Sequence, residues 1–401
     1  MDKKELEQQI DEILNRGTIV DILPSRAEFR DKLLSGEKLR FYIGFDATAP
    51  TLHLSHAKNF MLLEKFRKLG NEVIVLFGDF TARIGDPTGE SSARKQLSRE
   101  EVLDNVKKWK ELILPLMDFN SKENPPQIKY NNDWLSKLNF EDIINLASNL
   151  TVQQLLERDM FEKRIGEGKP IHLHEFLYPL MQGYDSVAMD VDVEVCGTDQ
   201  IFNALTGRTL LRKLKNKNKF VVAVTLMENP KTGELMSKSK GTGIFLDTGA
   251  NDKFGQIMSQ PDEMIEILFI NCTMISLEEI KKIITMNPRD AKLKLAEEIT
   301  KIFHGEEAAQ KARENFINTF SKKEIPEDVR EVKVGEDEIK LVEFLVLAEV
   351  AKSKGDARRK IEQGGVSIDG EKMTDADKSL DNSFSEKIIK VGKKDFIKIV
   401  F

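Results

Sequence analysis

Strand-like and helix-like segments alternate between residues 39 and 225, and this alternation restricts the fold more than any other feature. The strand-like segments are 39–45 (LRFYIGF), 72–80 (EVIVLFGDF), 191–197 (VDVEVCG) and 219–227 (KFVVAVTLM), and the helix-like segments between them are 57–70 and 199–214. Strands that alternate with helices favour a parallel sheet with helices on its faces. We therefore predict an α/β domain with a doubly wound parallel sheet in residues 1–245.

The remaining segments have different patterns. Residues 99–190 are mostly helix-like, so we expect an inserted region, at about 110–190, between the two halves of the sheet. After residue 245 helical patterns follow one another without strands, which predicts a small all-α domain at 246–320. Residues 321–336 are polar and charged, as linkers are. Residues 337–401 combine two helical patterns with short strands, which predicts an α+β domain.

Composition excludes several classes of protein. The net charge is −6, so nucleic-acid binding would need a local basic patch rather than overall attraction. The longest apolar runs have the length of strands, and the first residues have the pattern of a charged amphipathic helix rather than a signal peptide. The two cysteines, Cys196 and Cys272, cannot form a disulfide framework and fit a reducing compartment. We expect a cytoplasmic protein that does not span a membrane.

Two of the five histidines, His53 and His56, lie where a helix is predicted to begin after the first strand. They could be metal ligands, phosphate ligands or ordinary helix-start residues. A metal site needs a third ligand, and the histidines at 172 and 174 belong to a distant segment. Ligands of doubly wound sheets bind beyond the carboxyl ends of strands, where helix N-termini attract anions. We therefore favour donation to a phosphate and predict no metal site.

The ends of the first two strands carry polar residues. Alternation in the first strand places Tyr42, Gly44 and Asp46 on one face, which is typical of a lined pocket or of a solvated edge strand. The loop RIGDPTGESSAR after the second strand places Asp86 between glycine and proline. Such a carboxylate can close an Asx-turn or face a ligand.

A polar stripe follows one face of the predicted helix that contains YPLMQGYD. Tyr178, Gln182 and Asp185 recur at i, i+4 and i+7, so they share that face. Buried polar groups without partners cost about 1–3 kcal/mol each, so the stripe needs either structural hydrogen bonds or a polar ligand. We favour a bound polar small molecule.

Two later loops carry further polar groups. The stretch CGTDQIFN places Asp199 and Gln200 at a turn between a strand and a helix. The stretch GELMSKSKGTG carries Lys238 and Lys240 among small residues. Such a loop suits closure over phosphates, although a solvated charged loop has the same composition.

Six motifs in this order over residues 42–239 resemble those of the bacterial-type tyrosyl-tRNA synthetases, a family of class I aminoacyl-tRNA synthetases. HLSH resembles the HIGH signature of the class and LMSKS its KMSKS signature, while YIGFDAT, IGDPTG, YPLMQGYD and GTDQ resemble motifs of the tyrosine family. Residues 351–370 resemble the S4 RNA-binding module of these enzymes. The resemblance implies a Rossmann-type catalytic domain, a helical anticodon-binding domain at 246–320 and an S4-like domain at 337–401.

The resemblance also implies an activity, which is the activation of L-tyrosine with ATP and the transfer of the tyrosyl group to tRNA(Tyr). The implied catalytic residues are His53, His56 and Lys238. The implied tyrosine ligands are Tyr42, Asp86, Tyr178, Gln182, Asp185 and Gln200. The implied ATP ligands are Gly44, Asp46, His53, His56, Asp199, Met236, Ser237, Lys238 and Ser239. RNA phosphates would meet Lys352, Lys354, Arg358, Arg359 and Lys360.

Further implications concern partners. ATP would arrive as a substrate with Mg²⁺, with no tightly bound cofactor. Two chains would form a homodimer through the region at about 110–190. Two rival interpretations stay open, a tryptophan-specific synthetase of the same fold and a synthetase-like RNA-binding protein with weakened activation.

Three positions depart from the family pattern. Ser55 and Cys196 stand where glycines are usual, and Leu235 replaces the first lysine of KMSKS. Because Leu235 removes a charge that would neutralise phosphate, we expect slower activation than in relatives with both lysines, with Lys240 as a partial substitute. Leu235→Lys should therefore accelerate tyrosine-dependent ATP–pyrophosphate exchange, and an unchanged rate would contradict this interpretation.

Overall fold

The computed structural model describes residues 2–86, 97–156, 159–236, 243–321, 329–335, 337–392 and 395–401. The chain divides into two compact units, residues 1–306 and 307–401. Within the described ranges, the helices are all too short or too polar to cross a membrane.

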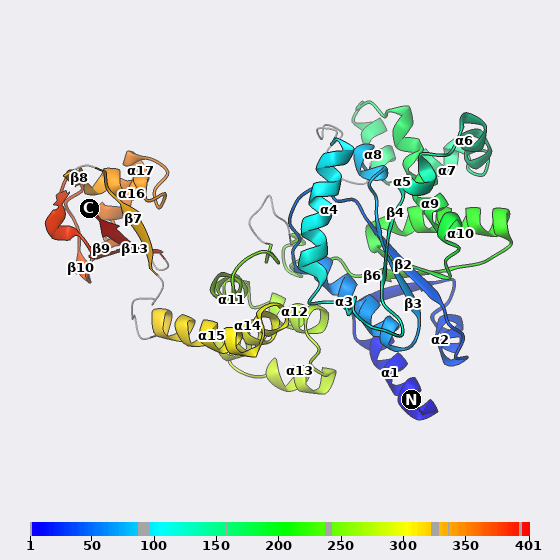
Figure 1. The fold of residues 1–401 in the computed structure, drawn as a ribbon, viewed down its shortest axis with the longest axis horizontal. Coiled ribbons are helices and arrows are strands. Elements are labelled where there is room, and N and C mark those ends of the chain that lie inside the picture. The colour runs from blue at the N-terminus through cyan, green and yellow to red at the C-terminus, as the bar shows by residue number, and fades with distance from the viewer. Residues whose placement is uncertain are drawn as a thin grey trace. The chain divides into compact units, whose positions relative to one another are not determined.

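A six-stranded sheet lies at the centre of the first unit, in the order β1-β6-β5-β2-β3-β4 (Figure 1). Its strands are β1 (Ile19–Leu23), β2 (Arg40–Phe45), β3 (Glu72–Phe77), β4 (Gln127–Tyr130), β5 (Val193–Gly197) and β6 (Phe220–Val224). All are parallel except β1, which pairs antiparallel with β6. The predicted parallel sheet is confirmed, and the structure adds the edge strands β1 and β4. The chain runs outward in both directions from the neighbours β2 and β5, which is the switch point where such sheets bind ligands.

Helices pack around this sheet and continue beyond it. They are α1 (Lys3–Asn15), α2 (Arg26–Leu34), α3 (Leu54–Lys68), α4 (Arg99–Ile113), α5 (Asn132–Leu135), α6 (Phe140–Ala147), α7 (Val152–Leu156), α8 (Asp159–Gly166), α9 (Tyr178–Met189), α10 (Ile201–Lys215), α11 (Ala250–Met258), α12 (Met264–Cys272), α13 (Leu277–Ile283) and α14 (Pro288–His304). The predicted helices at 57–70 and 199–214 correspond to α3 and α10. The second predicted strand is shorter than expected, because the chain leaves the sheet after Phe77 and forms a 3-10 turn at Thr81–Arg83.

The predicted insertion at about 110–190 begins later than expected. β4 lies inside that range but pairs in parallel with β3, so α4 and β4 continue the α/β pattern. The short helices α5 to α8 follow, and α9 packs closely on α10. Short strands with few apolar residues, such as QIKY in β4, give a weak periodic signal, which is why the sequence did not reveal this one.

The helices after residue 245 do not form a compact unit of their own. α12 packs on α3, and the Arg16 guanidinium donates to the carbonyls of Ile270, Thr273 and Ile275 at the end of α12, at 2.8–2.9 Å. These bonds satisfy carbonyl groups that a helix C-terminus leaves without partners. The predicted domain boundary at 245 is therefore not a boundary between compact units.

The second unit contains a β-rich fold, as the sequence predicted for the end of the chain. After α15 (Glu306–Ser321) come α16 (Leu341–Leu347), α17 (Lys354–Glu362) and the strands β7 (Arg330–Lys333), β8 (Glu338–Lys340), β9 (Val366–Ile368), β10 (Glu371–Lys372), β11 (Ser379–Asp381), β12 (Ile388–Val391) and β13 (Asp395–Val400). They form a sheet in the order β10-β9-β12-β13-β7 and a pair β11-β8.

The predicted linker at 321–336 is wrong in part. β7 pairs in parallel with β13, and Val334 is buried in the core of this unit, with Val332 packed against it. The charged residues next to these valines, Arg330, Glu331 and Lys333, gave the segment the composition of a linker, although alternate side chains face a core.

Candidate active site

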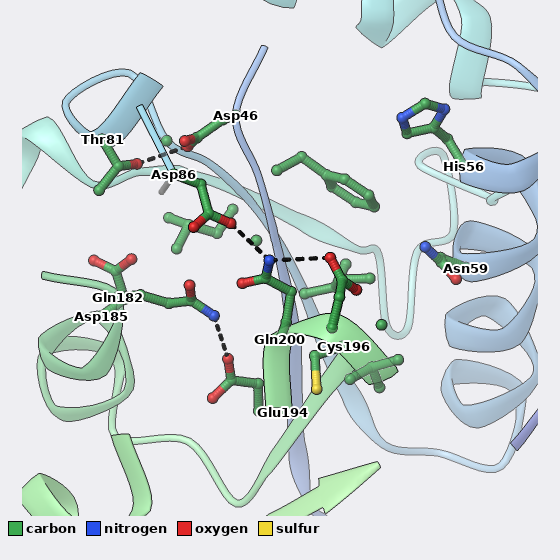
Figure 2. Close-up of a pocket in the computed structure, with 18 of the residues that line it drawn as sticks. Asp46, His56, Asn59, Thr81, Asp86, Gln182, Asp185, Glu194, Cys196 and Gln200 are labelled. Atoms are coloured by element: carbon green, nitrogen blue, oxygen red, sulfur yellow. Dashed lines mark hydrogen bonds between the residues drawn. The ribbon is translucent and has the colours of Figure 1, made fainter. Parts of the chain in front are cut away.

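A cavity of about 330 Å³ lies at the carboxyl ends of β2, β3 and β5, at the switch point of the sheet. The helices α3 and α9 contribute residues to its wall, and Figure 2 shows His56 and Asn59 on α3 across the cavity from a cluster of carboxylate and amide side chains. The predicted residues that line it are Gly44, Asp46, His56, Asp86, Tyr178, Gln182, Asp185, Asp199 and Gln200. Segments far apart in sequence thus converge on one site, as a ligand at a switch point requires.

The polar stripe on α9 faces this cavity. The Tyr178 hydroxyl donates to Asp46 at 2.8 Å, and the Thr81 hydroxyl donates to the other oxygen of the same carboxylate at 2.7 Å. Burial raises the pKa of Asp46 to about 7, with the nearby Asp86 acting in the same direction and the two hydroxyls opposing it. A side chain on Gly78 would collide with Asp46 and Thr81, so this arrangement needs glycine there, which the sequence did not indicate.

An amide–carboxylate network joins the turn after β5 to the loop after β3. Gln200 donates to Asp86 at 2.6 Å, as Figure 2 shows, and to Asp199 at 3.2 Å. Asn203 donates to the amide oxygens of Gln200 at 2.8 Å and Gln182 at 3.0 Å. The structure thus brings together four of the predicted site residues, and it adds Asn203 to them.

Asp185 is completely buried at the base of the stripe. Its carboxylate accepts hydrogen bonds from the Trp134 indole at 2.7 Å and from the Asn131 amide at 3.3 Å. Burial raises its pKa well above the usual range, although these donors oppose the shift. Sequence reasoning missed both donors. They follow β4 directly, so recognition of that strand would have placed them at the edge of the sheet where the site lies.

Tyr42, which the resemblance assigned to tyrosine binding together with Asp185, is not among the residues that line the cavity. Tyr42 is buried, and its hydroxyl lies 3.0 Å from the Ser186 hydroxyl and interacts with Glu194, which lines the cavity. Its position beneath the wall follows from close packing with Met189 and Val191, which a two-residue alternation cannot predict.

His53 and His56 lie at the start of α3. His53 is the N-cap residue, its ring centroid lies 4.1 Å from that of His56, and its backbone N–H donates to Nδ1 of His56 at 3.4 Å. An accepting Nδ1 leaves the proton of a neutral imidazole on Nε2. Burial lowers the pKa of His53 to about 4 and of His56 to about 3, so both rings are neutral donors at physiological pH. His56 lines the cavity, whereas His53 is not among the residues that line it.

No cluster of three or more His, Cys, Asp and Glu side chains suited to a metal ion occurs within the described ranges. The cavity wall instead contains a cation that the sequence analysis did not single out. Lys58 on α3 is buried and donates to the Asn59 side chain at 2.8 Å. Burial lowers its pKa to about 8.

The three departures from the family pattern occupy different environments. Ser55 and Cys196 line the cavity, and burial raises the pKa of the Cys196 thiol. Leu235 is 45% exposed, so a lysine there would meet no steric barrier from a packed core. Met236 is buried, whereas Ser237, Lys238, Ser239 and Lys240 lie outside the described residues.

The basic residues predicted to bind RNA lie on or next to α17. Lys352, Lys354, Arg358 and Arg359 are exposed, and Lys360 is partly exposed. Several have acidic neighbours, such as Glu343 at 2.6 Å from Lys354 and Asp377 at 2.8 Å from Arg358. Exposed cations therefore occur on α17 and just before it, with acidic residues beside some of them.

Both parts of the chain match families of known proteins. Residues 34–321 match the family "tRNA synthetases class I (W and Y)", and residues 322–399 match the "Tyrosine--tRNA ligase SYY-like C-terminal domain". The tyrosine–tRNA ligase of Carboxydothermus hydrogenoformans is 42% identical over 99% of this chain and 98% of that protein. The tyrosine–tRNA ligase of Aquifex aeolicus is 42% identical over 97% of each chain.

Solved structures share the fold at lower identity. A C-terminally truncated mitochondrial tyrosyl-tRNA synthetase of Aspergillus nidulans superposes with a TM-score of 0.67 at 22% identity, over 79% of this chain and 99% of that one. The tyrosyl-tRNA synthetase of Archaeoglobus fulgidus, solved with L-tyrosine, gives a TM-score of 0.59 at 19% identity, over 78% and 100%. With near full-length relatives at about 40% identity and both domain families matched in order, the chain belongs to the tyrosine–tRNA ligase family of class I aminoacyl-tRNA synthetases.

Proposed function

We propose that this chain activates L-tyrosine with ATP, forming tyrosyl-adenylate and pyrophosphate, and then transfers the tyrosyl group to tRNA(Tyr). The observation that carries the proposal is the convergence of Asp86, Gln182, Asp185, Gln200 and His56 on one cavity at the switch point. In activation the tyrosine carboxylate attacks the α-phosphorus of ATP and pyrophosphate leaves. No protein nucleophile is needed, so the residues act by positioning the substrates and by stabilising charge on the phosphate.

The amino-acid half of the site lies on the side of α9. Asp86, Tyr178 and Gln182 are the groups we assign to the α-ammonium, with Gln200 next to the carboxylate. Asp185 would accept a hydrogen bond from the phenolic hydroxyl, because two donors already hold its carboxylate in place. Tyr42 does not line the cavity, so we assign it an indirect effect on tyrosine binding.

The nucleotide half lies toward α3. We assign Gly44 and Asp199 to the ribose side, Asp46 to the region between nucleotide and amino acid, and the two imidazoles to the phosphates. Met236, Ser237, Lys238 and Ser239 would complete the ATP site from the signature loop, an assignment that rests on the resemblance. Mg²⁺ would enter with ATP, bound mainly by phosphate oxygens and water.

Tyrosine-dependent ATP–pyrophosphate exchange tests the proposal directly. Exchange that depends on tyrosine supports it, and exchange that depends on tryptophan would favour the related synthetase of the same family. No exchange with either amino acid would contradict a catalytic role and favour an RNA-binding protein. Charging of tRNA(Tyr) transcripts then tests the second step.

The pKa of Asp46 predicts a pH dependence of tyrosine binding. Asp46 has a pKa of about 7, so its carboxylate is mostly charged at pH 8 and mostly neutral at pH 6. The charged form holds the hydroxyl of Tyr178, which is one of the groups assigned to the α-ammonium, so KM for tyrosine should rise about tenfold from pH 8 to pH 6. Asp46→Asn should give a raised KM that is flat over this range. A flat profile in the unmodified enzyme would refute the role of Asp46.

We also propose that two chains form a homodimer through the inserted helices. Large apolar side chains are exposed in this segment, including Phe140 at 78% and Leu173 at 77%, and we assign them to the interface between the two chains. Phe140→Asp combined with Leu173→Asp should shift the protein from dimer to monomer in sedimentation velocity. Met274→Asp, an exposed apolar position outside the insertion, is the matched control. A monomeric unmodified protein would contradict the proposal.

The second unit would bind the tRNA through phosphate contacts from Lys352, Lys354, Arg358, Arg359 and Lys360. We place the reaction in the cytoplasm, and two supports favour this. The relatives are bacterial tyrosine–tRNA ligases, and the two cysteines are buried and free.

A further inference from the structure

A buried ion pair lies directly behind the amino-acid half of the cavity. Lys219 precedes β6 and its side chain is completely buried, as is that of Glu194 on β5. The Lys219 ammonium pairs with the Glu194 carboxylate and donates to the Ser186 hydroxyl at 2.6 Å. It also lies 5.6 Å from the centre of the Tyr42 ring, within range of a cation–π interaction.

The neighbouring backbone leaves space for this ammonium. A Cβ atom on Gly207 of α10 would lie 2.6 Å from Nζ of Lys219 and 2.8 Å from the Ser186 hydroxyl. A Cβ atom on Gly183 of α9 would lie 3.2 Å from the Gly207 backbone nitrogen. Glycines at both positions therefore let α9 and α10 approach closely around the Lys219 side chain.

The ion pair connects to the cavity through Glu194, which lines it. One Glu194 oxygen accepts a hydrogen bond from the Gln182 amide at 3.1 Å, as Figure 2 shows, while Asn203 donates to the Gln182 oxygen at 3.0 Å. These two bonds fix which end of the Gln182 amide faces which neighbour. The Lys219 ammonium also donates to the Ser186 hydroxyl, which lies 3.0 Å from the Tyr42 hydroxyl.

We propose that Lys219 is a positioning residue for tyrosine recognition, acting through Glu194 on Gln182 and through Ser186 on Tyr42. The inference deepens the proposed function and rests on it. Without the ammonium, the buried Glu194 side chain next to Tyr42 and Asp185 has no cation to compensate it. The Glu194 carboxylate then accepts hydrogen bonds from other donors, and the Gln182 amide is no longer held in one orientation. ATP, whose assigned contacts lie toward α3, does not depend on this network.

Lys219→Met tests the proposal, with steady-state kinetics of pyrophosphate exchange and the melting temperature as readouts. KM for tyrosine should rise about tenfold or more, while KM for ATP stays within twofold. Lys217→Met is the matched control, because Lys217 lies two residues away and pairs with Asp192 near the surface. It should leave both KM values unchanged.

A double variant distinguishes a positioning role of Lys219 from a loss of packing around its side chain. Adding Glu194→Gln to Lys219→Met removes the uncompensated charge and keeps an oxygen that can accept from Gln182. In the double variant, KM for tyrosine should return most of the way to its value in the unmodified enzyme. Lost packing around Lys219 would not allow that return, because the packing defect is still present.

Three results would overturn the proposal: an unchanged tyrosine KM in folded Lys219→Met, an equal rise in both KM values, or no recovery in the double variant. If Lys219→Met does not fold, Gly207→Ala decides the question, because its methyl group displaces the ammonium without removing a polar group. A raised tyrosine KM in that variant supports the proposal, and an unchanged one refutes it. If the unmodified enzyme shows no tyrosine-dependent exchange, the proposed function itself fails, whatever these variants do.

Discussion

Asp185→Asn is expected to reduce kcat/KM for tyrosine about a hundredfold while leaving activity toward phenylalanine nearly unchanged. The substitution removes a charged acceptor from the end of the pocket assigned to the phenolic hydroxyl. Hydrogen bonds to charged groups contribute about 1.5–3 kcal/mol, which corresponds to a factor of roughly ten to a hundred. A site that hydrogen-bonds a hydroxyl rejects the analogue that lacks it, and this enzyme family is the established example.

Stability provides the control for this prediction. Burial raises the pKa of Asp185, while the hydrogen bonds from Trp134 and Asn131 oppose that shift. In Asp185→Asn one of these two donors would face an amide nitrogen instead of an oxygen, so the melting temperature at pH 8 is measured to show that the variant is folded. Pyrophosphate exchange with tyrosine and with phenylalanine measures the discrimination. If Asp185→Asn reduced both activities equally, Asp185 would not read the hydroxyl.

His56→Ala is expected to slow adenylate formation by about a hundredfold to a thousandfold, the usual effect of removing one donor from a preorganised oxyanion site. The proposed cause is loss of the Nε2 proton, which the neutral ring would donate to the phosphate. Tyrosine affinity should change little, because the assigned tyrosine contacts lie across the cavity from α3. Single-turnover kinetics in a rapid-quench instrument separate the two quantities.

The pKa of His56 adds a second readout. Since burial holds its pKa at about 3, the ring stays neutral between pH 6 and pH 9, and the rate of the chemical step should show no ionisation of His56 there. His56→Asn, which keeps an N–H donor, should recover part of the lost rate. A chemical step in His56→Ala as fast as in the unmodified enzyme would exclude His56 from catalysis.

The sequence predicted much of the site because its residues follow local rules. Tyr178, Gln182 and Asp185 share a helix face by their spacing alone, and Asp199 and Gln200 follow a strand that is strongly apolar. The start of α3 could also be predicted, because His53 and His56 lie between a predicted strand and a predicted helix. Such positions depend on neighbours within a few residues, which a sequence records directly.

The partners of these residues could not be predicted in the same way. Trp134 and Asn131 reach Asp185 across about 50 residues of chain, because β4 adds a strand that has almost no periodic signal. In the sequence, Lys219 is a charged residue at the end of a predicted strand, where an exposed side chain is expected. In the structure its side chain is completely buried. Its burial depends on two glycines on different helices, which only the packing of α9 on α10 brings together.

By itself, then, the sequence determined the doubly wound sheet, which follows from periodicity along the chain, and the family, which follows from the resemblance of its motifs to those of known synthetases. The tertiary structure decided what each polar group faces. It placed Tyr42 behind the wall rather than in the cavity, gave Asp185 its two donors and enclosed Lys219 with Glu194. The reason is physical: hydrogen bonds and ion pairs in a buried site depend on distances between segments, and those distances are set only when the helices pack on the sheet.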